Sequence, residues 1–476
     1  MQGWELLVCC WCCCGITLAG AMSAAPVFVM DYALAPSSRW RGALALATQG
    51  RSWEDSWGPI FKFHDAQLFS KLEKKDVARL GAALDAHFHT QAQELRGVAA
   101  QFGELFPEQA AKVTYEYLAA WVYYHELAHT NVVENDYSAV VTKECTGLLA
   151  MDEKESVFHV ANMDQSPSNV RNVTLHVRFM NSSQGLDVLY EGVDWYWFTT
   201  GTSRMVARNI GSFQENWRTS SPSLPLEQVI AAIEDGVSPQ IFVFRDLLEE
   251  VITTANSSNS VNFEYLVDRM SSIRLAAPYY VVMAGPGKRE GAIIARSTSG
   301  VAGDEGVSRF SNDNKNGTLS SWALVQTNYD HWKPDSSDDP RRTAAEETMK
   351  NMGRRGSLEL TLFSVASTFP VHNPHTAYTA VFDIRTGTLR AFVRTGLCPA
   401  DPGATFLNER YDQYCSGSGG DGPKNKMHLV EIIVFGIGAC MLALSIVVFM
   451  RASRNGAGET RRRSNDEALL LNRQEI

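Results

Sequence analysis

The sequence predicts an α+β fold: a layered domain of strands and helices, preceded by a helical segment and followed by one transmembrane helix. Between residues 69 and 124, apolar side chains recur at the three- and four-residue spacing of amphipathic helices. After residue 145, short β-rich runs alternate with helical stretches, which is typical of layered domains. Residues 432–450 then form a run without a charge. A helix of that length crosses the ~30 Å hydrocarbon core of a membrane.

The composition indicates a globular chain that does not bind nucleic acid. The 476 residues are 45% hydrophobic, and 43 basic side chains face 53 acidic ones, a net charge of −10. Because contact with a phosphate backbone requires a basic face, this balance argues against a nucleic-acid partner. Nine cysteines are too few for a disulfide-built scaffold of this length.

The N-terminal residues have the composition of a secretory signal peptide. An apolar stretch from Leu6 to Ala25 ends in small residues. We assign residues 1–25 to the signal peptide and residues 26–144 to the helical segment. Because the stretch follows Glu5 and is preceded by no Lys or Arg, a retained N-terminal anchor is the alternative.

The C-terminal residues predict a single-pass type I membrane protein. We assign residues 416–428 to a flexible stalk, 429–450 to the transmembrane helix and 451–476 to a tail. Arginines cluster after the span, at Arg451, Arg454 and residues 461–463, which places the tail in the cytosol. Four glycosylation sequons precede the span and agree with this topology; they are Asn172, Asn181, Asn256 and Asn316.

The tail contains Asp466 followed by Leu470 and Leu471, which has the form of an acidic dileucine sorting signal. Sorting adaptors would read such a signal, so we expect an endosomal or lysosomal membrane with the main domain in the lumen. The alternative is a short amphipathic segment beside the membrane.

The part after Cys145, residues 145–415, is expected to form the layered domain. Its expected strands are 174–179, 195–199, 279–284, 292–296 and 322–327, and then a hairpin of 378–384 and 389–394. Its expected helices are 226–234, 242–253 and 342–352.

The cysteines single out one thiol. Six of the nine lie in the two terminal apolar runs, which leaves Cys145, Cys398 and Cys415. Cys398 and Cys415 are close enough in a Pro/Gly-rich region to form a disulfide, worth about 3 kcal/mol through loop closure. That pairing leaves Cys145 alone at the seam between the helical and β-rich parts, as either a functional thiol or a structural one.

A second motif suggests different chemistry. His125, Glu126 and His129 form the H-E-x-x-H pattern, in which two histidines on one helix face bind zinc and the glutamate acts as base. No third ligand follows at a recognisable spacing, so we assign no metal site. A zinc peptidase remains an alternative.

Several ordered blocks carry a family resemblance. The first runs from Glu144-Cys145-Thr-Gly to Ala161-Asn162-Met-Asp164. The others are Tyr279 to Gly285 with Arg289-Glu290-Gly291, Gln326 to Pro334 followed by Asp339 to Thr343, and Phe369-Pro-Val-His-Asn373. Over about residues 145–395 they resemble the family of acid ceramidase and N-acylethanolamine-hydrolysing acid amidase, which are cysteine N-terminal-nucleophile hydrolases.

The resemblance implies a four-layer αββα fold and a precursor that cuts itself between Glu144 and Cys145. It implies that Cys145 is the nucleophile and that Asp164 holds its α-amine. Asn328 would stabilise the oxyanion, and Arg341 would lie near the site. The implied substrate is a lipid amide, ceramide or an N-acylethanolamine, hydrolysed without a cofactor and with a lipid-activator protein as a possible partner.

One position departs from the family motif. Ala161 stands where the motif has an arginine, whose charge would favour the thiolate of the nucleophile. Another cation, Arg341 or Arg208, would have to replace it. A catalytically silent, lipid-binding relative is therefore the second alternative.

Overall fold

The computed structural model describes the chain from Met22 to Arg394, except for short gaps. The described residues are 22–132, 145–185, 187–219, 223–255, 262–303, 305–311, 319–335, 339–354 and 357–394. The description below concerns these residues alone.

A six-stranded antiparallel sheet forms one of two central layers. Its order is β1 (Met22–Ala24), β15 (Thr388–Arg394), β14 (Thr376–Asp383), β4 (Val157–Asp164), β3 (Thr146–Met151) and β13 (Ala323–Gln326). β3 and β4 are a hairpin in which Thr146 pairs with Asn162 and Met151 with Val157. This hairpin occupies the centre of the sheet and carries the first block of the family resemblance.

A nine-stranded sheet forms the second central layer. Its order is β11 (Gly300–Val301), β10 (Gly291–Ser297), β9 (Tyr279–Ala284), β8 (Gly211–Trp217), β7 (Arg204–Ala207), β6 (Val188–Asp194), β5 (Leu175–Met180) and β2 (Val27–Asp31), and β12 (Val307–Arg309) also pairs with β10. The pairs are antiparallel except β2 with β5, which is parallel. Strands β1 and β2 thus join residues that precede the helical segment to the two sheets.

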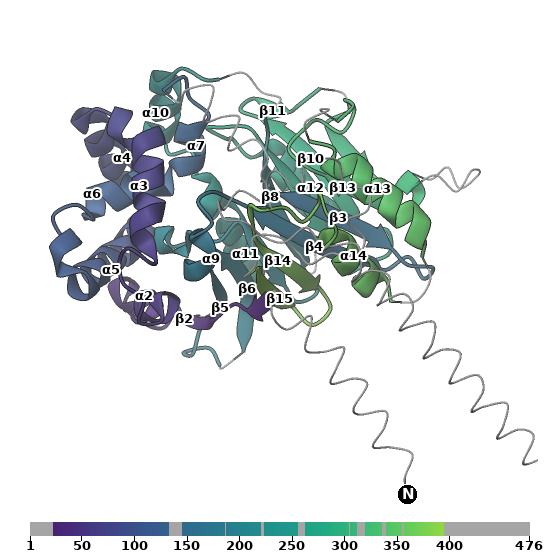
Figure 1. The fold of residues 1–476 in the computed structure, drawn as a ribbon, viewed down its shortest axis with the longest axis horizontal. Coiled ribbons are helices and arrows are strands. Elements are labelled where there is room, and N and C mark those ends of the chain that lie inside the picture. The colour runs from purple at the N-terminus through teal and green to yellow at the C-terminus, as the bar shows by residue number, and fades with distance from the viewer. Residues whose placement is uncertain are drawn as a thin grey trace, which may run out of the picture. The chain divides into compact units, whose positions relative to one another are not determined.

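The two sheets pack face to face, and helices cover their outer faces (Figure 1). Strand β4 contacts β9, β3 contacts β8, and β14 contacts β7 across the interface. Helices α13 (Arg341–Met352) and α14 (Leu358–Ala366) pack on the first sheet, and α11 (Gln240–Ala255) and α12 (Phe263–Ser272) pack on the second. The order of layers is therefore helix, sheet, sheet, helix, as expected from the family resemblance.

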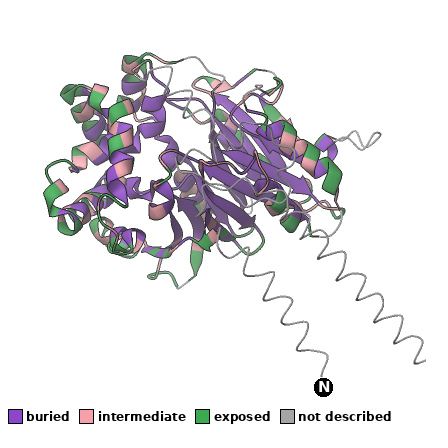
Figure 2. Cartoon of the chain, viewed as in Figure 1, coloured by how far each residue is buried: buried purple, intermediate pink, exposed green. Residues whose placement is uncertain are grey.

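Because each sheet is covered on both faces, its central strands are buried throughout (Figure 2). Every residue of β3, β8 and β9 is buried. Strands in this position have no solvent face, so a strand such as β9 is an apolar run without alternation. Strand β8 differs, because Ser212, Gln214, Glu215 and Asn216 are buried in it. Polar residues inside such strands require partners, and this makes them informative about function.

The helical segment packs beside the sheets on an aromatic core. It comprises α2 (Ala43–Thr48), α3 (Trp57–Gln67), α4 (Lys74–His87), α5 (His89–Leu105), α6 (Tyr115–Val122) and α7 (Tyr124–Ala128), and α10 (Leu226–Glu234) packs against it. Phe61 and Trp121 lie 5.3 Å apart between ring centroids, and Trp121 and Phe198 lie 5.4 Å apart. Phe198 belongs to the β-rich part, so this cluster joins the segment to the layered domain.

Most predicted elements are present, and one prediction was wrong. Residues 195–199 were expected to form a strand, but they form a turn ending in the 3₁₀-helix η4 (Trp197–Thr199). The Asp194 carboxylate accepts the backbone N–H of Trp195 at 2.8 Å and fixes the chain in this turn. The β propensity of the aromatic side chains had suggested a strand, whereas they serve the core just described.

The membrane predictions fall outside the described residues. Among the residues that the structure describes, no helix is both long and apolar enough to cross a membrane. The predicted span, stalk and tail, including Asp466, Leu470 and Leu471, and the predicted Cys398–Cys415 pair lie beyond Arg394. Strand β1 lies inside the range assigned to the signal peptide. These assignments remain predictions.

Candidate active site

Cys145 lies directly before strand β3, where the two sheets face each other. Its side chain is 2% exposed, and its backbone has φ of 70°. This left-handed conformation is unfavourable for a residue with a Cβ, so the fold holds the backbone here under strain. Such strain falls at the predicted point of cleavage. Glu144 itself lies outside the described residues.

The thiol of Cys145 lies against a buried cation. Nη2 of Arg204 donates a hydrogen bond to Sγ over 2.8 Å, and Sδ of Met163 lies 3.4 Å from Sγ. Arg204 begins strand β7 of the opposite sheet and is fully buried. A guanidinium in contact with sulfur favours the thiolate, which is the nucleophilic form.

Neighbouring groups hold Arg204 in place. Nη1 donates to the hydroxyl of Ser203, which in turn donates to the carboxylate of Asp194. Burial acts to lower the pKa of Arg204, but the negative charges of Cys145 and other neighbours outweigh burial, and the pKa is raised. Arg204 therefore stays charged at any physiological pH.

Arg341 connects the other predicted residues. It is the first residue of α13, and its Nη1 donates to the carbonyl oxygen of Cys145 at 2.8 Å and to Asp164 at 3.2 Å. Its Nη2 donates to Oδ1 of Asn328 at 2.8 Å, and Asp339 accepts from both Nε and Nη2 at 2.7 Å. The structure thus brings Cys145, Asp164, Asn328 and Arg341 together, as the sequence blocks implied.

Asp164 closes strand β4 beside the start of β3. The pairing of Thr146 with Asn162 brings the end of β4 next to the backbone of Cys145. The carboxylate accepts from Nδ2 of Asn373 at 2.8 Å and from the hydroxyl of Thr376. Burial raises the pKa of Asp164, whereas Arg341 and these hydrogen bonds act to lower it.

Asn328 follows strand β13 and is fully buried. Its side-chain Nδ2 donates to the backbone carbonyl oxygen of Trp217 at 3.0 Å. Its backbone carbonyl oxygen accepts from the backbone N–H of Thr219 at 3.1 Å. An amide nitrogen carries two hydrogens, and the contacts within the described chain use one of them. The second can serve a developing oxyanion.

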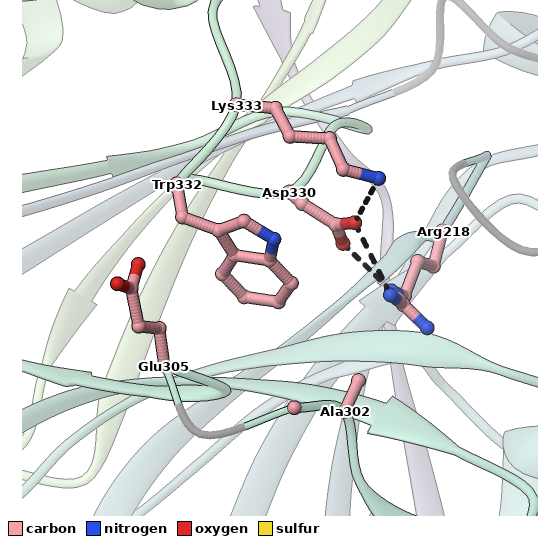
Figure 3. Close-up of a pocket in the computed structure, with 7 residues that line it drawn as sticks. Arg218, Ala302, Glu305, Asp330, Trp332 and Lys333 are labelled. Atoms are coloured by element: carbon pink, nitrogen blue, oxygen red, sulfur yellow. Dashed lines mark hydrogen bonds and ion pairs between the residues drawn. The ribbon is translucent and has the colours of Figure 1, made fainter.

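A cavity of about 420 Å³ is lined by Asp330, Trp332 and Lys333, which follow Asn328 in the sequence, and by Arg218 (Figure 3). The carboxylate of Asp330 accepts from Nε of Arg218 at 2.8 Å and pairs with Lys333 at 3.0 Å. Trp332 and Glu305 line the opposite part of the cavity (Figure 3). Arg218 lies between Trp217 and Thr219, the two residues that hydrogen-bond to Asn328.

The position of the missing family arginine is filled from elsewhere. Ala161 is buried on β4, opposite Gly147 of β3 and Ala380 of β14. Of the two cations expected to replace the charge, Arg341 or Arg208, Arg208 is exposed beyond the end of β7. Arg341 donates to the carbonyl oxygen of Cys145, and its charge also interacts with the Cys145 side chain.

Sequence reasoning missed Arg204, although a signal was present. Residues 199–207 contain one charged side chain among small and apolar residues. A lone arginine in a buried strand must have an acidic or functional partner, because an unpaired buried charge is costly. Which partner it reaches depends on how the two sheets are packed, and the sequence does not show this.

The residues of the zinc motif do not gather as metal ligands. His125 and Glu126 lie in the short helix α7 and His129 follows it, all three buried. The ring of His129 stacks on Trp217, and Glu126 accepts the backbone N–H of Gln240 at 2.6 Å. Within the described residues, no group of three or more His, Cys, Asp or Glu side chains is arranged to hold a metal.

Two predicted glycosylation sites lie in the described part of the chain. Asn172 is half-buried in α9 (Val170–Val173), and its Nδ2 donates to the carbonyl of Asp55 at 3.0 Å. Asn181 follows β5 and is half-buried. Asn256 and Asn316 fall outside the described residues.

The chain matches no protein-family model, but it is similar to several curated proteins. It is 31% identical over 241 residues to the N-acylethanolamine-hydrolyzing acid amidase of Rattus norvegicus, covering 50% of this chain and 59% of that protein. It is 26% identical over 276 residues to the acid ceramidase of Heterocephalus glaber, covering 54% and 63%. The chain thus spans about three fifths of the length of these relatives.

Among solved structures, the chain is similar to the Caenorhabditis elegans ortholog of N-acylethanolamine-hydrolyzing acid amidase. The identity is 27%, the TM-score is 0.41, and the match covers 51% of this chain and 94% of that one. The curated relatives carry the two names that the sequence blocks suggested. By sequence, the chain is therefore similar to N-acylethanolamine-hydrolyzing acid amidases and acid ceramidases over about half of its length.

Proposed function

We propose that the chain is a cysteine N-terminal-nucleophile amidase that hydrolyses a lipid amide, ceramide or an N-acylethanolamine, to a fatty acid and an amine. The contact between Arg204 and the thiol of Cys145 carries this proposal. It supplies the charge whose absence at Ala161 had suggested a silent relative. The names of the curated relatives support the substrate class.

The first reaction is self-cleavage. The sulfur of Cys145 bonds to the carbonyl carbon of Glu144, and the peptide C–N bond breaks as its nitrogen takes the thiol proton. This leaves a thioester and a free α-amine on Cys145. Water then hydrolyses the thioester, which gives a new C-terminal carboxylate on Glu144 and restores the thiol. The strained backbone at Cys145 lowers the barrier to this step.

The second reaction is hydrolysis of the substrate amide. The α-amine of Cys145, held by Asp164, takes the thiol proton, and the thiolate attacks the substrate carbonyl. Asn328 donates to the oxyanion of the tetrahedral intermediate. The ammonium then protonates the leaving nitrogen, the amine departs, and water releases the fatty acid from the thioester.

We place this reaction on the lumenal side of a lysosomal or endosomal membrane. The supporting observations are the uncharged run at residues 432–450, the arginines behind it and the Asp466, Leu470, Leu471 signal. The membrane helix, sorting adaptors and a lipid-activator protein are the partners of this proposal. None of them is required by the chemistry above.

Mass analysis of the purified protein at acid pH tests the proposal. Wild type should yield a fragment that begins at Cys145, and Cys145→Ala should remain intact. Fatty-acid release from an N-acylethanolamine or from ceramide should follow cleavage and be lost to a thiol reagent. A wild-type chain that stays intact and releases no fatty acid would identify a silent relative instead.

A further inference from the structure

A second cavity is about 330 Å³ in volume. It is lined by residues in and next to β1, by the loop after α2, by α9 and the residues around it, and by the end of β15. Three arginines line it: Arg51 from the loop after α2, Arg171 from α9 and Arg394 at the end of β15. Its other lining residues are small, apolar or uncharged polar ones, and none of the described lining residues is an aspartate or glutamate. The cavity is therefore strongly basic.

Neutral groups hold all three guanidinium groups in place. Arg51 donates to the carbonyl of Asn172 at 3.1 Å, Arg171 to that of Thr376 at 3.0 Å, and Arg394 to the hydroxyl of Thr379 at 3.0 Å. In the described part of the chain, none of the three forms an ion pair with a carboxylate, although arginines elsewhere in the fold do. Their positions are fixed while their charges are not neutralised.

Two of these charges are buried. Arg394 is 3% exposed and Arg171 is 8% exposed. Burial lowers the pKa of Arg394 to about 10, and it also lowers the pKa of Arg171. The charge of the Asp164 carboxylate acts to raise the pKa of both arginines. Asp164 is itself paired with Arg341 at 3.2 Å. Buried cations without a counter-charge are costly, so an anion entering this cavity would relieve the cost.

The shape of the guanidinium group suggests the class of anion. Its planar fork binds two oxygens of a phosphate or carboxylate at once. Three arginines lining one cavity exceed what a single carboxylate uses, whereas a phosphate offers oxygens in three directions. The cavity is also larger than a single phosphate requires, since one water molecule takes up ~30 Å³ in liquid water.

We propose that the cavity bordered by Arg51, Arg171 and Arg394 is a binding site for a phosphate group, either free phosphate or the phosphate of a monoester. Arg51 lies before the predicted cleavage point, and the other two lie after it. If the chain is cut before Cys145, the anion joins the two pieces; only this clause rests on the proposed function. The site itself is independent of cleavage.

The test is a titration of the full chain with inorganic phosphate at fixed ionic strength, followed by calorimetry and thermal unfolding. We expect saturable binding in the millimolar range or tighter and a rise in the unfolding temperature. Arg51→Gln should weaken binding by about tenfold, since it removes one charged donor. Arg51→Lys should retain part of the affinity. The matched control Arg41→Gln, an exposed arginine that does not line the cavity, should bind like wild type.

Glycerol phosphate distinguishes the two sources. Tighter binding than inorganic phosphate, with the same loss in Arg51→Gln, assigns an esterified phosphate; weaker binding assigns the free ion. The proposal is overturned if neither binds, or if Arg51→Gln is folded by circular dichroism and binds like wild type. Cys145→Ala is titrated in parallel, because its unchanged binding separates this site from any failure of self-cleavage.

Discussion

At the scale of residues, the central observation is that the guanidinium group in contact with the Cys145 thiol comes from β7 rather than from β4. On β4, Ala161 and Met163 point to the same face, since side chains two apart share a face, and Met163 contacts the sulfur of Cys145. The Cβ direction of Gly147, opposite Ala161, faces Gln214 and Val282 of the second sheet. Ala161 therefore faces the sheet interface from which Arg204 reaches the thiol.

The first prediction concerns this cation. Arg204→Met should lower kcat/KM by about a hundredfold or more, because the thiolate loses the donor that stabilises it. The low-pH limb of the rate profile should move to higher pH. Arg204→Lys should retain more activity than Arg204→Met. Equal kinetics for wild type and a folded Arg204→Met would show that the contact does not act in catalysis.

The second prediction exchanges the two positions. In an Arg204→Ala chain, the added change Ala161→Arg should recover about tenfold of the lost kcat/KM, because both positions face the same interface. In the wild-type background, Ala161→Arg should reduce activity, since two guanidinium groups would then compete for one buried space. The four rates form a double-mutant cycle. Additive effects on log(kcat/KM) would contradict a shared place for the two side chains.

At the scale of elements, β5, β9, β10, β13, β14 and β15 were predicted as strands, whereas the other strands, including the inner strands β3, β4, β7 and β8, were not. Residues 279–284 were predicted as a strand and form β9 with the same bounds, because a strand buried on both faces is a continuous apolar run. Helix α14 was not predicted. Its sequence from Leu358 to Ala366 is also largely apolar, and its start is marked only by Ser357, whose hydroxyl accepts the N–H of Leu360.

The candidate site was also predicted only in part. Cys145, Asp164, Asn328 and Arg341 lie in continuous blocks of sequence, so resemblance alone was enough to name them. Arg204 acts across the space between two sheets, and no local pattern encodes that distance. The phosphate cavity combines three distant segments and was not foreseen for the same reason.

The third prediction concerns the junction between α5 and α11. Glu94 is fully buried, accepts from Arg245 at 2.7 and 2.9 Å and from Trp40 at 3.0 Å, and also pairs with Arg39. Glu94→Ala removes the buried partner of Arg245, which then keeps, among the described residues, only the half-buried Glu249 as a carboxylate partner. The change should lower the free energy of unfolding by about 3–5 kcal/mol. Denaturant unfolding measures this. The control Glu104→Ala, exposed on the same helix, should change stability by less than about 0.5 kcal/mol.

At the scale of the whole molecule, buried titratable groups set the pH at which the fold is most stable. Burial raises the pKa of Glu215 to about 8 and that of Glu126 to about 7. Burial lowers the pKa of four histidines to about 3; they are His64, His125, His159 and His372. The two sets of groups act in opposite directions.

The fourth prediction follows from their signs. The glutamates stabilise the fold fully below the ordinary glutamate pKa, and this contribution is lost as the pH rises through 7 and 8. The histidines stabilise it fully above their ordinary pKa of 6.5, and this contribution is lost as the pH falls towards 3. We therefore expect the unfolding temperature to peak at about pH 6–7.

Thermal unfolding from pH 4 to pH 8 checks this, with two variants. Glu215→Gln should flatten the alkaline side of the curve, because folding then no longer requires a carboxylate at position 215 to take up a proton. Glu104→Gln should not change the curve. A curve that rises steadily towards pH 8 would contradict the prediction.

The contact between Arg204 and Cys145 has a consequence for the maturation of the protein. Cys145 precedes β3 of one sheet and Arg204 lies in β7 of the other, so neither sheet alone holds both the thiol and the guanidinium group that contacts it. Under the proposed function, cutting at Glu144 would then depend on correct assembly of both layers. A misfolded copy would stay uncut and inactive, so the proposed processing would release activity only from correctly folded molecules.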